Sequence, residues 1–107
     1  MLYYLQALNI KFKKLGEITV RLNNAMTVEE VFWMVRCIFH YSDKVIIRGV
    51  GDGCLKIALG TITAIKDMSY NGEALELIDY QTNPTKTTKG DDREEFVYIY
   101  EKVRRTL

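Results

Sequence analysis

Apolar and polar residues alternate near the start of the chain, and this alternation predicts a β-hairpin. Apolar side chains at every second position place one face of a strand in the core and the other in water. The first alternating run consists of Leu8, Ile10 and Phe12, and the second of Ile18, Val20 and Leu22. Gly16 lies between the runs and can supply the positive φ that a short turn needs. We therefore expect two paired strands within residues 8–22.

A helical pattern follows over residues 27–41. Thr27 and Glu30 have the spacing of a capping box, which marks a helix N-terminus. Apolar residues then recur at helical spacing and form one stripe: Val28, Val31, Phe32, Val35, Ile38 and Phe39. This pattern predicts a helix that packs one face on the core.

The opposite side of this helix is also largely apolar. It carries Trp33, Met34, Cys37 and Tyr41. Monomers rarely expose an apolar patch of that size, and Trp, Tyr and Met are enriched at protein interfaces. These four residues are therefore the candidate interface; the alternative is that a second layer of the same domain covers them.

The rest of the chain predicts strands. We expect strands at 45–50, at 54–65 with a bend at Gly60, at 74–80 and at 94–103. The intervening segment, from about 81 to 94, contains the only proline together with many Thr, Lys and Asp residues. That composition is typical of a mobile loop.

Together these elements predict a single α+β domain over residues 1–107. The expected architecture is a mainly antiparallel, curled sheet of five or six strands packed on one central helix, 27–41. No repeat or domain boundary is evident in the sequence.

The glycine-rich segment Gly49–Gly53 raises the question of a phosphate site. Such a loop needs a helix to follow it, because the helix N-terminus provides the amides and the positive end of the dipole. The segment that follows, CLKIAL, has the alternation of a strand. We therefore interpret the glycines as a turn, with positive φ at Gly53.

Composition and charge narrow the function classes. Fifteen Lys and Arg residues against 14 Asp and Glu residues leave a net charge of +1, which provides no long-range attraction to nucleic acid or anionic lipid. No signal peptide and no apolar run of about 20 residues are present, so a cytoplasmic protein without a membrane span is expected. The two cysteines are expected to be reduced, buried thiols.

Catalytic and metal-binding patterns are weak. Cys37 and His40 lie three residues apart on the predicted helix, but no orienting group or oxyanion site accompanies them. One histidine and two distant cysteines match no metal-ligand spacing. The sequence therefore predicts a protein that is not an enzyme and has no catalytic, metal or cofactor residues.

The C-terminal segment suggests a nucleic-acid alternative. The aromatic residues Tyr98 and Tyr100 lie close to Lys102, Arg104 and Arg105 in the sequence. Aromatic rings beside cations can stack on single-stranded bases. Packing of this aromatic row in the core is the other interpretation.

Residues from Thr27 to Tyr80 resemble the YolD-like small proteins of bacteria and their phages. Asp52, Gly53, Gly60, Ile62 and Ile65 carry the match. The resemblance implies a helix followed by an Sm-like, strongly bent sheet, and the N-terminal hairpin departs from that pattern. Residues 18–35 also resemble the hairpin-to-helix unit of β-grasp domains.

From these observations we expect a non-enzymatic interaction or adaptor module of a bacterium or mobile element. It would bind a protein partner or form a homo-oligomer. The alternative is an Sm-like barrel that binds single-stranded nucleic acid.

Overall fold

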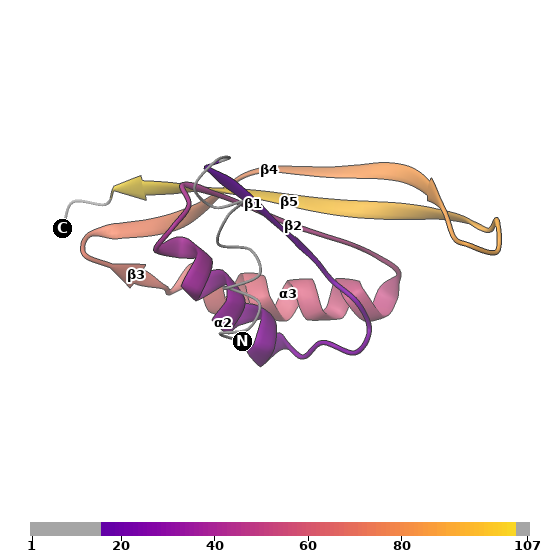
Figure 1. Ribbon diagram of the computed structural model, residues 1–107, viewed down its shortest axis with the longest axis horizontal. Coiled ribbons are helices and arrows are strands. Elements are labelled where there is room, and N and C mark those ends of the chain that lie inside the picture. Colours follow the sequence, from indigo (N-terminus) through magenta and orange to yellow (C-terminus); the bar gives the residue numbers. More distant parts are fainter. Residues whose placement is uncertain (1–15, 105–107) are drawn as a thin grey trace.

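A computed structural model describes residues 16–104 as a two-layer α+β fold (Figure 1). The strands are β1 (Glu17–Arg21), β2 (Lys44–Val50), β3 (Ser69–Tyr70), β4 (Glu73–Lys86) and β5 (Asp92–Arg104). The helices are α2 (Val28–Phe39) and α3 (Asp52–Lys66). Figure 1 shows both helices on the same side of the sheet, so one sheet face packs on the helices and the other carries none.

The five strands form one mixed sheet in the order β1-β2-β5-β4-β3. β1 and β2 are parallel, with α2 as the crossover between them, and the remaining pairs are antiparallel. This corrects the prediction of a mainly antiparallel sheet on one central helix. The sheet has two free edges within the described residues, so it is not the closed barrel that the Sm-like resemblance implies.

The helix at 28–39 forms as its pattern predicts. The Thr27 hydroxyl accepts a hydrogen bond from the Glu30 amide at 3.1 Å, which satisfies one of the free donors at the helix start. Val31, Val35, Ile38 and Phe39 are buried and face the sheet. The predicted strand at 18–22 is present as β1, whereas its expected partner at 8–12 lies outside the described residues.

Residues 54–65 form most of α3, not a strand as the alternation predicted. Cys54, Ala58, Thr61 and Ile65 are the buried positions, and their spacing of four, three and four residues is helical. Gly60 therefore lies inside a helix and marks no strand bend. The Thr61 hydroxyl donates to the Ile57 carbonyl at 2.8 Å, which satisfies a buried polar group within the helix.

The segment predicted as a loop at 81–94 is largely a β-hairpin. β4 and β5 stay paired out to Lys86 and Asp92, and the connection occupies only residues 87–91. Gly90 has a φ of 86° in this connection, where the Asp91 carbonyl accepts from the Thr87 amide. The hairpin extends past the start of α3 and projects from the two-layer body (Figure 1).

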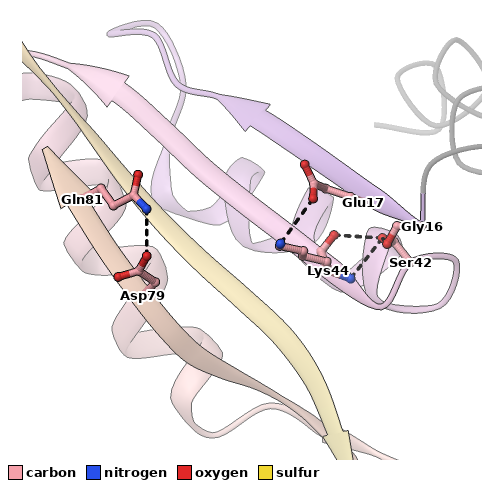
Figure 2. A network of polar contacts seen from close by, with 6 residues as sticks. All are labelled: Gly16, Glu17, Ser42, Lys44, Asp79 and Gln81. Carbon is pink, nitrogen blue, oxygen red and sulfur yellow. Dashed lines mark hydrogen bonds and ion pairs between the residues drawn. The ribbon is translucent and has the colours of Figure 1, made fainter. Parts of the chain in front are cut away.

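A serine joins the start of β1 to the segment after α2. The buried Ser42 hydroxyl donates to the Gly16 carbonyl at 2.7 Å and accepts from the Lys44 amide at 3.3 Å (Figure 2). Gly16 has the positive φ that its sequence context predicts, at 58°. Beside it, Lys44 pairs with Glu17 across the two parallel strands at 3.5 Å.

Candidate docking groove

The projecting hairpin and the first turn of α3 enclose an open groove of about 750 Å³. Leu55 lines it from the helix. The hairpin contributes Tyr80, Pro84 and Phe96. Cavities of 300–1,000 Å³ are the usual size of ligand-binding clefts, so this groove is large enough to receive part of a partner.

The pairing of β4 with β5 turns the groove residues toward the helices. Tyr80 pairs with Tyr98, and Thr82 with Phe96. Directly paired residues share a sheet face, and Phe96 and Tyr98 belong to the core on the helix side. The Tyr80 ring packs on Tyr98 with centroids 4.7 Å apart, yet half of Tyr80 remains exposed. Tyr80 therefore offers one aromatic face held in place by a buried ring.

The groove is lined mainly by negative charge. Asp52, Asp92 and Glu94 line it, against one cation, Arg93. Lys86 lies 3.6 Å from Asp92 in a well-exposed pair, which provides little stabilisation. Within residues 16–104 no cation pairs with Asp52 or Glu94. Two carboxylates are thus available to a ligand.

The outer edge of β4 is protected against pairing with another strand. β3 covers only Glu73 and Ala74, so the edge beyond them has no neighbour in the described residues. Pro84 has no amide to donate, and a register irregularity occurs between Leu77 and Asp79. The Asp79 carboxylate also accepts from the Tyr80 amide at 2.9 Å. It accepts from the Gln81 side chain at 2.8 Å as well (Figure 2). A partner would therefore contact the groove through side chains and not by strand addition.

The four residues of the predicted interface stripe differ in their surroundings. Trp33 is 42% exposed on the side of α2 away from the core, with the Arg36 guanidinium 5.0 Å from its ring centroid. Tyr41 is exposed, Cys37 is half-buried, and Met34 packs against the core. Trp33 and Tyr41 are thus exposed aromatic residues on and just after α2, and neither lines the groove.

The predicted nucleic-acid contacts are also dispersed. Tyr98 and Tyr100 are buried, and burial together with the neighbouring Tyr98 raises the pKa of Tyr100 to about 12. The Lys102 ammonium lies over the Phe39 ring at 4.7 Å. Arg104 is exposed, and Arg105 lies outside the described residues. The two rings lie in the core with no face open for stacking, so this set does not form one surface.

The glycine-rich segment Gly49–Gly53 leads into a helix, so the argument that no helix dipole is available there is wrong. α3 begins at Asp52, and the positive φ is at Gly51 (93°), whereas Gly53 is helical. A phosphate ligand is still disfavoured for another reason. Asp52 lies in the first helical turn, and its carboxylate and those of Asp92 and Glu94 would repel a phosphate.

No catalytic arrangement surrounds the cysteines and the histidine in the described residues. The His40 ring packs edge-on against Tyr70 at 4.9 Å. Cys37 and Cys54 are free thiols, and the Cys54 sulfur lies 3.5 Å from the Asn24 side-chain oxygen. Residues 16–104 contain no cluster of three metal-binding side chains. Over the same range, neither helix is long and apolar enough to cross a membrane.

The residues that line the groove were not predicted from sequence. Tyr80, Leu55 and Asp52 lie on three segments whose approach depends on the helical form of 52–66 and on the length of the hairpin. The register irregularity between Leu77 and Asp79 shifts the alternation of β4 by one residue, so alternation continued from Leu77 would have placed Tyr80 on the outer face. The local sequence pattern therefore does not identify Tyr80 as a groove residue.

No protein-family model matches the chain, and no curated protein matches it. Among solved structures, Alba from Thermoplasma volcanium is similar over 78% of this chain and 98% of its own, with 16% sequence identity and a TM-score of 0.48.

Proposed function

We propose that the protein is a non-enzymatic interaction module that binds a segment of a partner protein in the groove between α3 and the β4–β5 hairpin. The half-exposed ring of Tyr80, positioned by Tyr98 at the base of the hairpin, is the observation that carries this proposal. Aromatic anchors at the centre of a concave surface account for much of the energy of protein interfaces.

Further apolar side chains are exposed on the two elements that border the groove. Leu59 of α3 and Leu77 of β4 are 49% and 42% exposed. A second, smaller cavity of about 210 Å³ lies between Ile62 and Leu77. Exposed apolar surface is typical of interaction sites.

Two variants of exposed aromatic residues test the proposal. Tyr80→Ala removes the groove anchor, whereas Trp33→Ala removes a comparable exposed ring on α2. A protein captured by the wild type from its host is purified and titrated against both variants. We expect Tyr80→Ala to weaken binding at least tenfold, in the range of interface hot spots, and Trp33→Ala to change it less than twofold. The reverse ranking, or equal affinity for both variants, would refute the groove as the docking site.

Single-stranded nucleic acid is the second candidate partner, and cations at the end of the hairpin favour it. The projecting hairpin carries Lys86, Lys89 and Arg93 near its tip, and a row of cations can contact the phosphates of a single strand. The carboxylates of Asp91, Asp92, Glu94 and Glu95 in the same segment oppose it. Binding of a labelled oligonucleotide that weakens with added salt and with Lys89→Gln would favour this candidate over the first.

A further inference from the structure

We infer that the ligand of the groove is a segment of a partner protein that places an arginine side chain against Tyr80. This inference rests on the proposed function and specifies the chemistry of the partner. Its basis is the combination of an exposed aromatic face with a carboxylate lining in one concave site.

The charges that line the groove favour a positively charged group on the ligand. Asp52, Asp92 and Glu94 contribute three negative charges, and Arg93 contributes one positive charge. The N-terminus of α3 adds roughly half a positive charge. Arg93 pairs with Thr85, so its Cβ lies on the sheet face opposite Tyr80 and Thr82. Lys86 lies on the same face as Tyr80 and pairs with Asp92 at 3.6 Å, so Asp52 and Glu94 are the carboxylates without a paired cation in residues 16–104 on the side where a ligand would lie.

Arginine fits this site better than lysine. A planar guanidinium can stack on the open face of Tyr80 and at the same time donate a pair of hydrogen bonds to one carboxylate. The ammonium of lysine is a compact, strongly hydrated charge, so it cannot stack flat on a ring while it donates two parallel hydrogen bonds to a carboxylate. Glu94 lies on the same hairpin face as Tyr80, four residues further along the hairpin because it pairs with Pro84, and both residues line the groove.

The same charges disfavour a second copy of the described part of this chain as the occupant. Two facing copies of the groove would bring four carboxylates together, Asp52 and Glu94 of each copy, none of which has a paired cation in the described residues. The protected edge of β4 also prevents the two sheets from joining edge to edge. An arginine-containing segment of a different protein avoids the repulsion between like charges and does not need the edge of β4.

Short peptides test the inference without knowledge of the partner. The probe is the heptapeptide Gly-Ser-Leu-Arg-Leu-Ser-Gly, with lysine, citrulline or glutamate in place of the arginine in matched peptides. Binding is followed by amide chemical shifts of the isotope-labelled protein. We expect the arginine peptide to shift the amides of Leu55, Tyr80 and Thr82, to bind at least threefold tighter than the lysine peptide, and at least tenfold tighter than the citrulline peptide.

Matched variants locate the charge effect. Glu94→Gln should weaken the arginine peptide at least threefold, while Glu29→Gln, which removes an exposed carboxylate from α2, should leave its affinity unchanged. Equal binding of the arginine and citrulline peptides, shifts confined to residues outside the groove, or no binding of any peptide would overturn the inference. The proposed function is judged separately, because it depends on how the captured partner responds to Tyr80→Ala.

Discussion

Gly60 of α3 lies directly against Val28 at the start of α2. A Cβ atom added at Gly60 would meet Val28 Cγ2 at 2.7 Å, closer than such atoms approach in proteins. The glycine therefore allows the two helices to pack closely on the same sheet face. It explains why a residue that disfavours helices occupies the middle of α3.

The first prediction concerns this contact. Gly60→Ala should lower the free energy of unfolding by about 1 kcal/mol, because a clash of 1–3 kcal/mol outweighs the gain of roughly 1 kcal/mol in helix propensity. In a Val28→Ala background the clash is gone, so the same change should raise stability by up to about 1 kcal/mol. Urea denaturation of the four proteins measures the coupling. Equal effects in the two backgrounds would show that the side chain of Val28 does not limit the helix packing.

The second prediction distinguishes the two sides of α2. Trp33→Gln should cost no more than about 1.5 kcal/mol, since the ring is 42% exposed and its ring contacts within residues 16–104 are with Phe32 and Arg36. Ile38→Ala should cost about 2–5 kcal/mol, because Ile38 is fully buried and its truncation leaves a cavity. Thermal melts followed by circular dichroism measure both. A collapse of the fold with Trp33→Gln would mean that this side of α2 is covered.

The third prediction follows from the buried tyrosine Tyr100. Burial raises its pKa to about 12 in the folded protein, against about 10 for an unperturbed tyrosine. The unfolded chain therefore loses this proton first as the pH rises. The contribution of neutral Tyr100 to the free energy of unfolding is fully present below pH 10 and is lost between about pH 10 and 12.

The variant Tyr100→Phe isolates this effect. It should flatten the decline of stability over that pH range, measured as the urea midpoint at several pH values. Tyr98, whose pKa is also raised mainly by burial, should retain a smaller decline. An unchanged slope in Tyr100→Phe would contradict the assignment.

The part of the fold that the sequence predicted well depends on local signals. The capping pair Thr27 and Glu30 and the apolar stripe that follows define α2 without reference to the rest of the chain. The alternation of Ile18 and Val20 likewise defines β1. In both cases the local preference and the tertiary packing agree.

The mistakes arose where tertiary packing overrides local preference. α3 contains Ile57, Ile62 and Ile65, with threonines at 61 and 63, and these residues favour strands when judged alone. Burial of the 54, 58, 61 and 65 positions against the sheet stabilises the helix instead. The hairpin was missed for a related reason: its arms are polar on both faces, so their pairing leaves little hydrophobic pattern in the sequence.

The groove could not be predicted because it depends on α3 and on the β4–β5 hairpin, and neither element was predicted. Asp52 and Leu55 reach it only if 52–66 is a helix, and Tyr80 and Glu94 only if the hairpin extends beyond the helices. Of the four residues of the sequence-based candidate interface, Trp33 and Tyr41 are exposed, whereas Cys37 is half-buried and Met34 packs against the core.

Hydrogen exchange of the complex tests the central claim most directly. The purified partner is added in excess, and amide exchange is compared with that of the free protein. We expect slower exchange in residues 51–55 and 80–84, which line the groove, and no change in residues 33–39 of α2. Protection of 33–39 with unchanged exchange at 51–55 and 80–84 would contradict the account and place the docking surface on α2.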